Sequence, residues 1–437
     1  MENAIRDWRG RSYLPGPVPA DRSRMFWLAL AAMAAISPLQ YGFAALLATE
    51  PGGLTLLAVW IACQAAGALP ALHLVRRGRL GVRACLAAGA VLSGLGLAAA
   101  AFTGPALPLA LAGYALLGGL GAGLVYGVCG EVVSSWYPDR PAARVGLITG
   151  AFGYGAVPLL LWAGIAPAAT GTAFLVAAVL AVAVIGAAAR YLRLSPALWW
   201  PVDVDPRSHA LNAARLRTNP DAAKEFRLGQ AMRTRTLPAL ALILTCAGAV
   251  SVFDVIVVAG TGSWGAVALL VALNGASRSI AMRASEVFGR RRVLAAVLGS
   301  LALGQVLLAA AAQNATVLTA PPAAFPEAGV AAGPLVWLGA GGPLVWLGAV
   351  FAGLGGGAFY PLLASLVREF FGAERAGEIH AVVYSAKALA GIVAALLALA
   401  ALSAPVTALA VAAALAALPA LATPHLRVPG LPATLPL

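Results

Sequence analysis

The chain has 437 residues, of which 61% are hydrophobic and only 10% are charged, and its formal net charge is +13. A soluble domain of this length could not hide so much apolar surface, whereas a protein that crosses a membrane many times needs it. The four cysteines and four histidines are scattered singly along the chain, so we expect no disulfide framework, no metal site and no cofactor.

Twelve apolar runs, each long enough to cross a bilayer, follow one another along the chain. The first run follows a charged segment, 1–24, without a small-residue cleavage site, so we expect a retained span, not a signal peptide. The first six runs cover approximately 25–48, 52–75, 84–103, 107–135, 144–166 and 169–190. After a polar segment at 191–236, the other six cover approximately 237–260, 264–286, 293–312, 343–367, 378–402 and 404–423. The pattern predicts an all-α polytopic membrane protein of two six-helix halves, 25–190 and 237–423, with a cytoplasmic tail at 424–437.

Basic residues decide the expected orientation. Of the 29 lysines and arginines, 27 lie near the termini or in loops that follow even-numbered runs, and the loops after odd-numbered runs have none. The positive-inside rule therefore predicts a protein of the cytoplasmic (inner) membrane with both termini and the 191–236 linker in the cytoplasm. Because topology accounts for the net charge of +13, we expect no nucleic-acid partner. Two basic residues, Arg278 and Lys387, are left inside apolar runs.

Two local features bear on the element boundaries. The linker contains LWWPVDVDP and then an arginine-rich stretch whose pattern also permits a helix; Trp199 and Trp200 are expected at the membrane interface. The octapeptide GPLVWLGA occurs at 333–340 and again at 342–349, which we interpret as a local duplication. It leaves the start of the tenth helix open.

Arg278 and Lys387 lie at matching depth. Each is about eight or nine residues from the predicted cytoplasmic end of its helix, which is roughly 12–13 Å and near the middle of the bilayer. A cation there costs about 2.5–3.5 kcal/mol. One interpretation is that each pairs with a buried acid, but Glu131, Glu286 and Asp254 lie at other depths. We therefore favour an anion-binding site between the two cations.

Tyrosines accompany these cations. Tyr126, Tyr154, Tyr360 and Tyr384 fall roughly 9–15 Å from cytoplasmic helix ends, and Gln40 and Tyr41 lie deeper in the first run. Interfacial anchoring is the alternative, but it is typical of tyrosines at the ends of spans. We expect a cavity wall whose hydroxyl groups and ring edges face a small anion.

The two six-helix halves joined by a cytoplasmic linker resemble the major facilitator superfamily. Its loop signature recurs as SEVFGRRR at 285–292, with Glu286 in the usual aspartate position, whereas the first copy, LVRRGRLGVR at 74–83, has no acid. The resemblance implies that gating residues lie in these loops. The expected gating residues are Glu286, Arg290 and Arg291 in the second copy, together with Asp139 and Arg140 in the loop after the fourth run.

A closer resemblance is to the oxalate:formate antiporter family. It is carried by GAGLVYGVCGEVVSSWYPDRPAARVGLITGAFGYGA at 121–156, by NGASR and YSAK around Arg278 and Lys387, and by the linker WWPVDVDP, similar to that of actinobacterial members. It implies that Arg278 and Lys387 hold the carboxylates of a small dianion inside a cage of aromatic and glutamine side chains. The matching positions are Gln40, Tyr41, Tyr126, Tyr154, Tyr360 and Tyr384. Tyr384 stands where the family has a tryptophan, and Gly356 replaces a further aromatic.

We therefore expect a monomeric carrier, surrounded by lipid, that exchanges small carboxylates such as oxalate and formate by alternating access. A proton-coupled monocarboxylate symporter that uses Asp254 or Glu131 is the alternative of the same fold. From other classes, a non-transporting carboxylate sensor stays open, whereas an enzyme is not expected because no HExxH or GxSxG motif and no Cys/His cluster is present.

Overall fold

The computed structural model describes residues 4–7, 10–75, 77–102, 107–211, 218–220, 222–314 and 342–430. Within these ranges, twelve helices are long and apolar enough to cross a membrane. The predicted class, an all-α polytopic protein with twelve spans, is confirmed.

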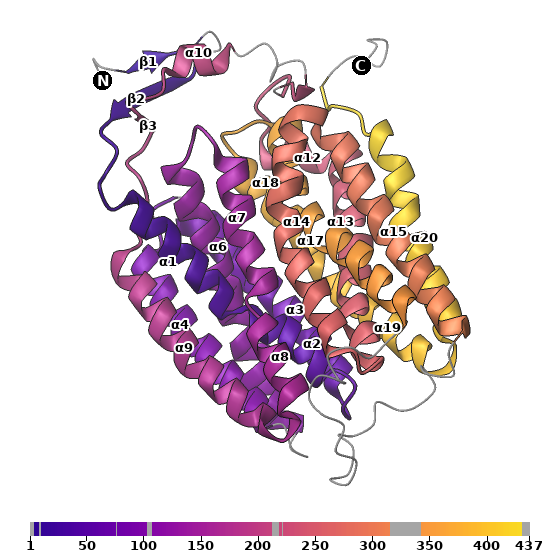
Figure 1. Cartoon of the computed structure of the whole chain (residues 1–437). Coiled ribbons are helices and arrows are strands. Elements are labelled where there is room, and N and C mark those ends of the chain that lie inside the picture. Colours follow the sequence, from indigo (N-terminus) through magenta and orange to yellow (C-terminus); the bar gives the residue numbers. More distant parts are fainter. Residues whose placement is uncertain are drawn as a thin grey trace.

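The six spans before the linker form what we call the N-terminal half, drawn in indigo to magenta in Figure 1. Several of its spans consist of two or three helical pieces. Its elements are α1 (Arg22–Ala35), η1 (Pro38–Gly42), α2 (Phe43–Leu46), α3 (Gly53–Pro70), η2 (Ala71–Val75), α4 (Val82–Ala101), α5 (Leu107–Ala110), η3 (Leu111–Gly118), α6 (Gly119–Trp136), α7 (Pro141–Tyr154), α8 (Val157–Ile165), η4 (Pro167–Ala169) and α9 (Thr170–Tyr191).

The six spans after the linker form the C-terminal half, drawn in salmon to yellow. The tenth span begins at Pro343, inside the second GPLVWLGA copy; the first copy lies outside the described residues. The elements of this half are α13 (Thr236–Gly260), α14 (Trp264–Phe288), α15 (Arg290–Asn314), α17 (Pro343–Phe371), α18 (Ala376–Ser385), α19 (Lys387–Ser403), α20 (Pro405–Ala422) and η6 (Thr423–His425).

Both chain termini lie at the same end of the bundle, which we call the terminus end (Figure 1). The linker elements α10 (Pro206–Ala210) and α12 (Leu228–Met232) lie there too. An even number of spans requires this arrangement.

A small sheet at the terminus end departs from the all-helical expectation. Strand β1 (Ile5–Arg6) pairs antiparallel with β2 (Ser12–Gly16), which pairs parallel with β3 (Trp199–Pro201) of the linker. Trp199 and Trp200 in β3 are 8% and 5% exposed, and their rings contact Trp136 and Tyr13 at centroid distances of 5.0 and 4.9 Å. Protein side chains therefore cover both rings, and the expected place of these tryptophans at the membrane interface stays a prediction.

Two contacts between the halves position the central side chains: α7 packs on α14, and α3 packs on α19. The first is very close, because a Cβ added to Gly150 would lie 2.6 Å from the carbonyl oxygen of Gly275. Small residues allow such close approach of helices in lipid.

Candidate functional site

Arg278 on α14 and Lys387, the first residue of α19, converge at the centre of the bundle. Their side chains are only 1% and 2% exposed. The guanidinium carbon of Arg278 lies 5.9 Å from the ring centre of Phe152 and 5.3 Å from that of Tyr360. The ammonium nitrogen of Lys387 lies 5.5 Å from each of the same two rings. The structure therefore brings together the two cations that the sequence analysis singled out.

The ammonium group of Lys387 is bound by two glutamines of the N-terminal half. Its Nζ donates hydrogen bonds to Oε1 of Gln40, at 2.9 Å, and to Oε1 of Gln64 on α3. Gln40 belongs to the predicted cage, whereas Gln64 was not among the predicted residues. In the sequence, Gln64 is marked only by a neutral amide in the middle of an apolar helix, which is less distinctive than a charge.

The guanidinium group of Arg278 is bound by Tyr41 and Asn274. Its Nη2 donates to Tyr41 Oη and to Asn274 Oδ1, both at 3.1 Å. Tyr41 Oη donates to the same Asn274 oxygen at 3.0 Å, and Asn274 Nδ2 donates to Ser251 Oγ at 3.1 Å. Asn274 and Ser251 were also missed. Asn274 lies four residues before Arg278, on the same helix face.

Only neutral oxygen atoms accept hydrogen bonds from these two cations. Within the described ranges, neither Arg278 nor Lys387 forms an ion pair with a carboxylate. Nε of Arg278 is buried and has no hydrogen-bond partner there. The alternative interpretation, in which each cation pairs with a buried acid, therefore does not fit this arrangement.

Aromatic side chains from four helices close around the cations. Tyr126 on α6 stacks on Tyr384 of α18, with ring centres 5.6 Å apart and planes 18° apart. Tyr126 also meets Phe152 at 5.7 Å, and Tyr360 lies 6.5 Å from Tyr384. Phe152, whose ring joins both cations and two of the tyrosines, was missed because a phenylalanine in an apolar helix is not distinctive.

Tyr154 lies apart from these contacts. It is the last residue of α7, its ring packs where α7 meets Gly275 of α14, and its hydroxyl donates to the Leu147 carbonyl at 3.4 Å. Of the predicted cage, the structure therefore groups Gln40, Tyr41, Tyr126, Tyr360 and Tyr384 around the cations and places Tyr154 at the helix contact behind them.

Interrupted helices carry several of these residues. Gln40 and Tyr41 lie in η1, a π-helical stretch that begins at Pro38. Proline cannot donate the backbone hydrogen bond that an α-helix needs, and π-helical turns are frequent at functional sites. Tyr114 Oη donates to the Leu39 carbonyl oxygen at 2.8 Å and so satisfies part of the altered backbone.

The eleventh span is interrupted at the site as well. Helix α18 ends at Ser385 and α19 begins at Lys387. The Ala386 carbonyl between them accepts a hydrogen bond from Thr245 Oγ1 of α13 at 3.3 Å. Helices broken at mid-membrane are typical of transporter binding sites, because the break frees polar backbone for a ligand or a neighbouring side chain.

The predicted gating residues form contacts within their own halves. Arg290 pairs with Glu369 of α17 at 2.6 Å, and Arg291 donates to the Leu426 carbonyl at 2.9 Å. Asp139 contacts Arg22 and Arg140, at 3.4 and 3.3 Å. Glu286 is exposed and forms no ion pair within the described ranges.

One ion pair that the sequence analysis missed joins the two halves at the terminus end. Arg77 lies in the loop after η2, and its Nη2 is 2.5 Å from Oε1 of Glu378 on α18. Arg77 belongs to the loop copy that lacks its own acid, so the acid is supplied by the other half.

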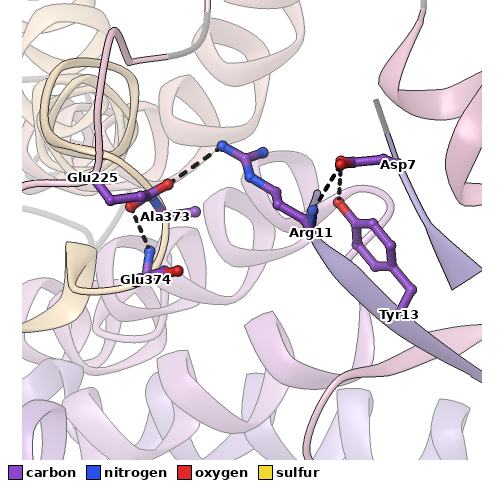
Figure 2. Close-up of polar contacts among 6 residues, drawn as sticks. All are labelled: Asp7, Arg11, Tyr13, Glu225, Ala373 and Glu374. Atoms are coloured by element: carbon purple, nitrogen blue, oxygen red, sulfur yellow. Dashed lines mark hydrogen bonds and ion pairs between the residues drawn. The ribbon is translucent and has the colours of Figure 1, made fainter. Parts of the chain in front are cut away.

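Figure 2 shows an ion pair that joins the N-terminal strands to the linker. Arg11 Nη2 lies 3.4 Å from Glu225 Oε1, and Glu225 accepts hydrogen bonds from the backbone nitrogens of Ala373, at 3.2 Å, and Glu374, at 3.1 Å. Asp7 accepts from the Arg11 backbone and from Tyr13 Oη; burial and this carboxylate raise the pKa of the Tyr13 hydroxyl. The N-terminal segment is thus tied to the loop between α17 and α18.

Comparisons with known proteins identify the kind of protein. A family model described as Major Facilitator Superfamily matches residues 23–395. No match was found among curated proteins.

Solved transporter structures resemble the chain over nearly its whole length. A POT family transporter in complex with 5-aminolevulinic acid has a TM-score of 0.63 at 12% identity, covering 92% of this chain and 96% of its own. The human organic anion transporter MFSD10 (TETRAN) has a TM-score of 0.56 at 16% identity, covering 93% and 100%. The nucleoside transporter NupG has a TM-score of 0.58 at 12% identity, covering 93% and 99%. At such low identities the likeness shows the fold alone, and that fold is the one predicted.

Proposed function

This chain belongs to the major facilitator superfamily, and from the chemistry of its central site we propose that it exchanges small carboxylate anions, oxalate- or formate-like, across the membrane by alternating access. It is a transporter of the secondary type, not an enzyme. The narrower assignment, to the oxalate:formate antiporter family, belongs to the proposal and rests on the segments around Arg278 and Lys387.

The observation that carries the proposal is a pair of buried cations that, among the described residues, are bound only by neutral oxygen atoms. Each costs about 2.5–3.5 kcal/mol at mid-membrane, a cost that amide and hydroxyl groups offset only in part. A dianion with one carboxylate on each cation would neutralise both through charge-assisted hydrogen bonds. The tyrosine hydroxyls and ring edges supply further donors to the same oxygen atoms.

The same charges favour exchange over uniport. If the halves closed around Arg278 and Lys387 without an anion, two desolvated like charges would face each other, which is strongly unfavourable. The carrier would therefore return to the first side only with another anion bound. A dianion, or a monocarboxylate such as formate, could serve as this return substrate.

Arrangement in the membrane is part of the proposal. The basic loops support a terminus end in the cytoplasm and a location in the cytoplasmic membrane. The binding site lies within one chain, so a monomer suffices.

Reconstituted vesicles test this function. Vesicles preloaded with unlabelled oxalate should take up labelled oxalate much faster than empty vesicles, and Lys387→Gln or Arg278→Gln should abolish uptake. Arg283→Gln is the matched control, because Arg283 is an exposed arginine on the same helix. Full uptake by Lys387→Gln would refute the two-cation site, and uptake indifferent to preloading would refute exchange.

Proton-coupled carriage of a monocarboxylate is the second candidate. The buried acid Asp254 favours it, since that carboxyl group lies on α13 and does not pair with either cation. In this case a pH gradient would drive uptake into empty vesicles.

A further inference from the structure

Asp254 on α13 and Gln305 on α15 form a polar pair away from the two cations. Their side chains are 1% and 0% exposed, and Gln305 Nε2 donates a hydrogen bond to Asp254 Oδ1. The other two oxygen atoms, Asp254 Oδ2 and Gln305 Oε1, are buried and have no hydrogen-bond partner within the described ranges. The central site uses neither residue.

A single proton would satisfy the hydrogen bonding of both oxygen atoms. An ionised carboxylate and an amide oxygen are both acceptors, and each buried acceptor without a donor costs about 1–3 kcal/mol. A single proton on Asp254 Oδ2 would turn that atom into a donor, for which Gln305 Oε1 is the available acceptor. Acid and amide would then form a ring of two hydrogen bonds in which no polar atom is left over.

Among the described residues, no charged neighbour offers a partner to these two oxygen atoms. The helices packed against α13 carry Arg278 on α14, Lys387 on α19, Tyr360 on α17, and His380 and Tyr384 on α18 as titratable groups within the membrane. Arg278, Lys387 and the two tyrosines have their contacts in the central site, and His380 lies beside Tyr384. Beyond the arginines at the start of α15, neither α15 nor α20 has an ionisable side chain.

A metal cation or a water molecule fits less well. Oxygen-binding cations such as Ca²⁺ take about six to eight oxygen ligands, and this pair offers two. No cluster of three acidic, histidine or cysteine side chains occurs in the described part of the chain. A water molecule could donate to both oxygen atoms, but it would leave a full negative charge in apolar surroundings.

We propose that Asp254 and Gln305 form a reversible proton-binding site in the C-terminal half, in which Asp254 is neutral in this conformation and gives up its proton as the pH rises. The site adjoins the anion site through α13. Ser251, one helical turn before Asp254, accepts the hydrogen bond of Asn274, which in turn accepts from Arg278. A negative charge on Asp254 would therefore appear one turn from the network that holds Arg278.

The inference deepens the second candidate function, but its test needs no transported substrate. Purified full-length protein in lipid nanodiscs is titrated from about pH 5 to about pH 9, the range in which buried carboxyl groups are known to titrate. Infrared spectroscopy detects the C=O stretch of a protonated carboxylic acid, which a carboxylate lacks. We expect such a band at neutral pH, its loss at alkaline pH, and its return on reacidification.

Asp254→Asn assigns the band. The asparagine amide offers an N–H to Gln305 Oε1 and an oxygen to Gln305 Nε2, so it mimics the protonated pair and should remove the band without unfolding the protein. Glu131→Gln, a change at another buried acid, is the control and should leave the band in place. A band that is absent at neutral pH, or that persists unchanged to alkaline pH, would overturn the proposal.

Thermal unfolding gives an independent readout. The Tm of the wild-type protein should fall as the pH rises, because deprotonation leaves an uncompensated charge between α13 and α15, whereas the Tm of Asp254→Asn should lose this fall. Equal pH dependence in both proteins would contradict the inference. Because neither readout involves anion transport, failure here would leave the exchange proposal standing, and failure of exchange would leave this site standing.

Discussion

At the scale of single residues, Arg278 and Lys387 carry buried charges, which are energetically unfavourable inside a membrane. The neutral groups around them cannot neutralise these charges. Arg278 and Lys387 could be identified from sequence because a cation inside an apolar run is an exception that counting exposes. Gln64, Asn274 and Phe152 could not, because neutral amides and rings in apolar helices break no rule of composition. They belong to the site because of contacts between helices that are distant in the sequence. Gln64 and Lys387, for example, are separated by 323 residues.

Gln64 gives the sharpest residue-scale prediction. Its amide oxygen accepts from Lys387, so Gln64→Glu would place a carboxylate of nearly the same shape against the ammonium group. We expect the variant to fold and to be at least as heat-stable as the wild type, because the buried cation gains a counter-charge. Its binding of small dicarboxylates should fall at least tenfold, because the built-in carboxylate competes with the ligand.

The measurement is thermal stabilisation by a series of oxalate concentrations, since a ligand that binds only the folded state raises Tm. Gln230→Glu is the matched control, because Gln230 lies on α12 at the terminus end, outside the site. Unchanged oxalate stabilisation in Gln64→Glu would show that Lys387 does not hold the anion.

At the scale of elements, the twelve spans could be predicted to within a few residues, because length and hydrophobicity determine them. The interruptions inside them could not. Pro38 was a signal for η1, but Ala386, where the eleventh span breaks, has no helix-breaking character. The three short strands were missed for a related reason: pairing of Leu14 with Trp199 joins segments far apart in sequence, and strands of two to five residues carry little periodicity.

The interruption at η1 predicts the effect of Pro38→Ala. Alanine restores the missing backbone donor, so the π-helical stretch should relax toward an α-helix and turn Gln40 and Tyr41 away from Lys387 and Arg278. We expect an unchanged or higher Tm together with a severalfold loss of oxalate affinity, measured by the same stabilisation assay. Pro419→Ala, at a proline inside α20, should leave affinity unchanged. Equal affinity in Pro38→Ala would mean that η1 does not position the site.

At the scale of the whole molecule, the two halves meet at the central site and again at the terminus end. The central cations belong to the C-terminal half, whereas Gln40, Gln64 and Tyr41 belong to the N-terminal half. Separation of the halves would therefore break both hydrogen bonds of Lys387 and the Arg278–Tyr41 hydrogen bond at once, and an anion that bridges the halves would oppose it. At the terminus end, the Arg77–Glu378 ion pair opposes the same movement. Arg11–Glu225 ties the N-terminal strands to the linker at the same end (Figure 2).

The Arg77–Glu378 pair predicts a shift in the conformational equilibrium. Arg77 is 41% and Glu378 16% exposed at the side chain, so the pair contributes up to about 1 kcal/mol, roughly a fivefold change in population. Spin labels at the exposed residues Arg79 and Arg375, one in each half, report the opening of the terminus end. Arg77→Gln and Glu378→Gln should each enlarge the long-distance population, and the double variant should add little to either. The charge-swapped variant Arg77→Glu/Glu378→Arg should restore the wild-type distribution, whereas fully additive single effects would show that the two side chains act independently.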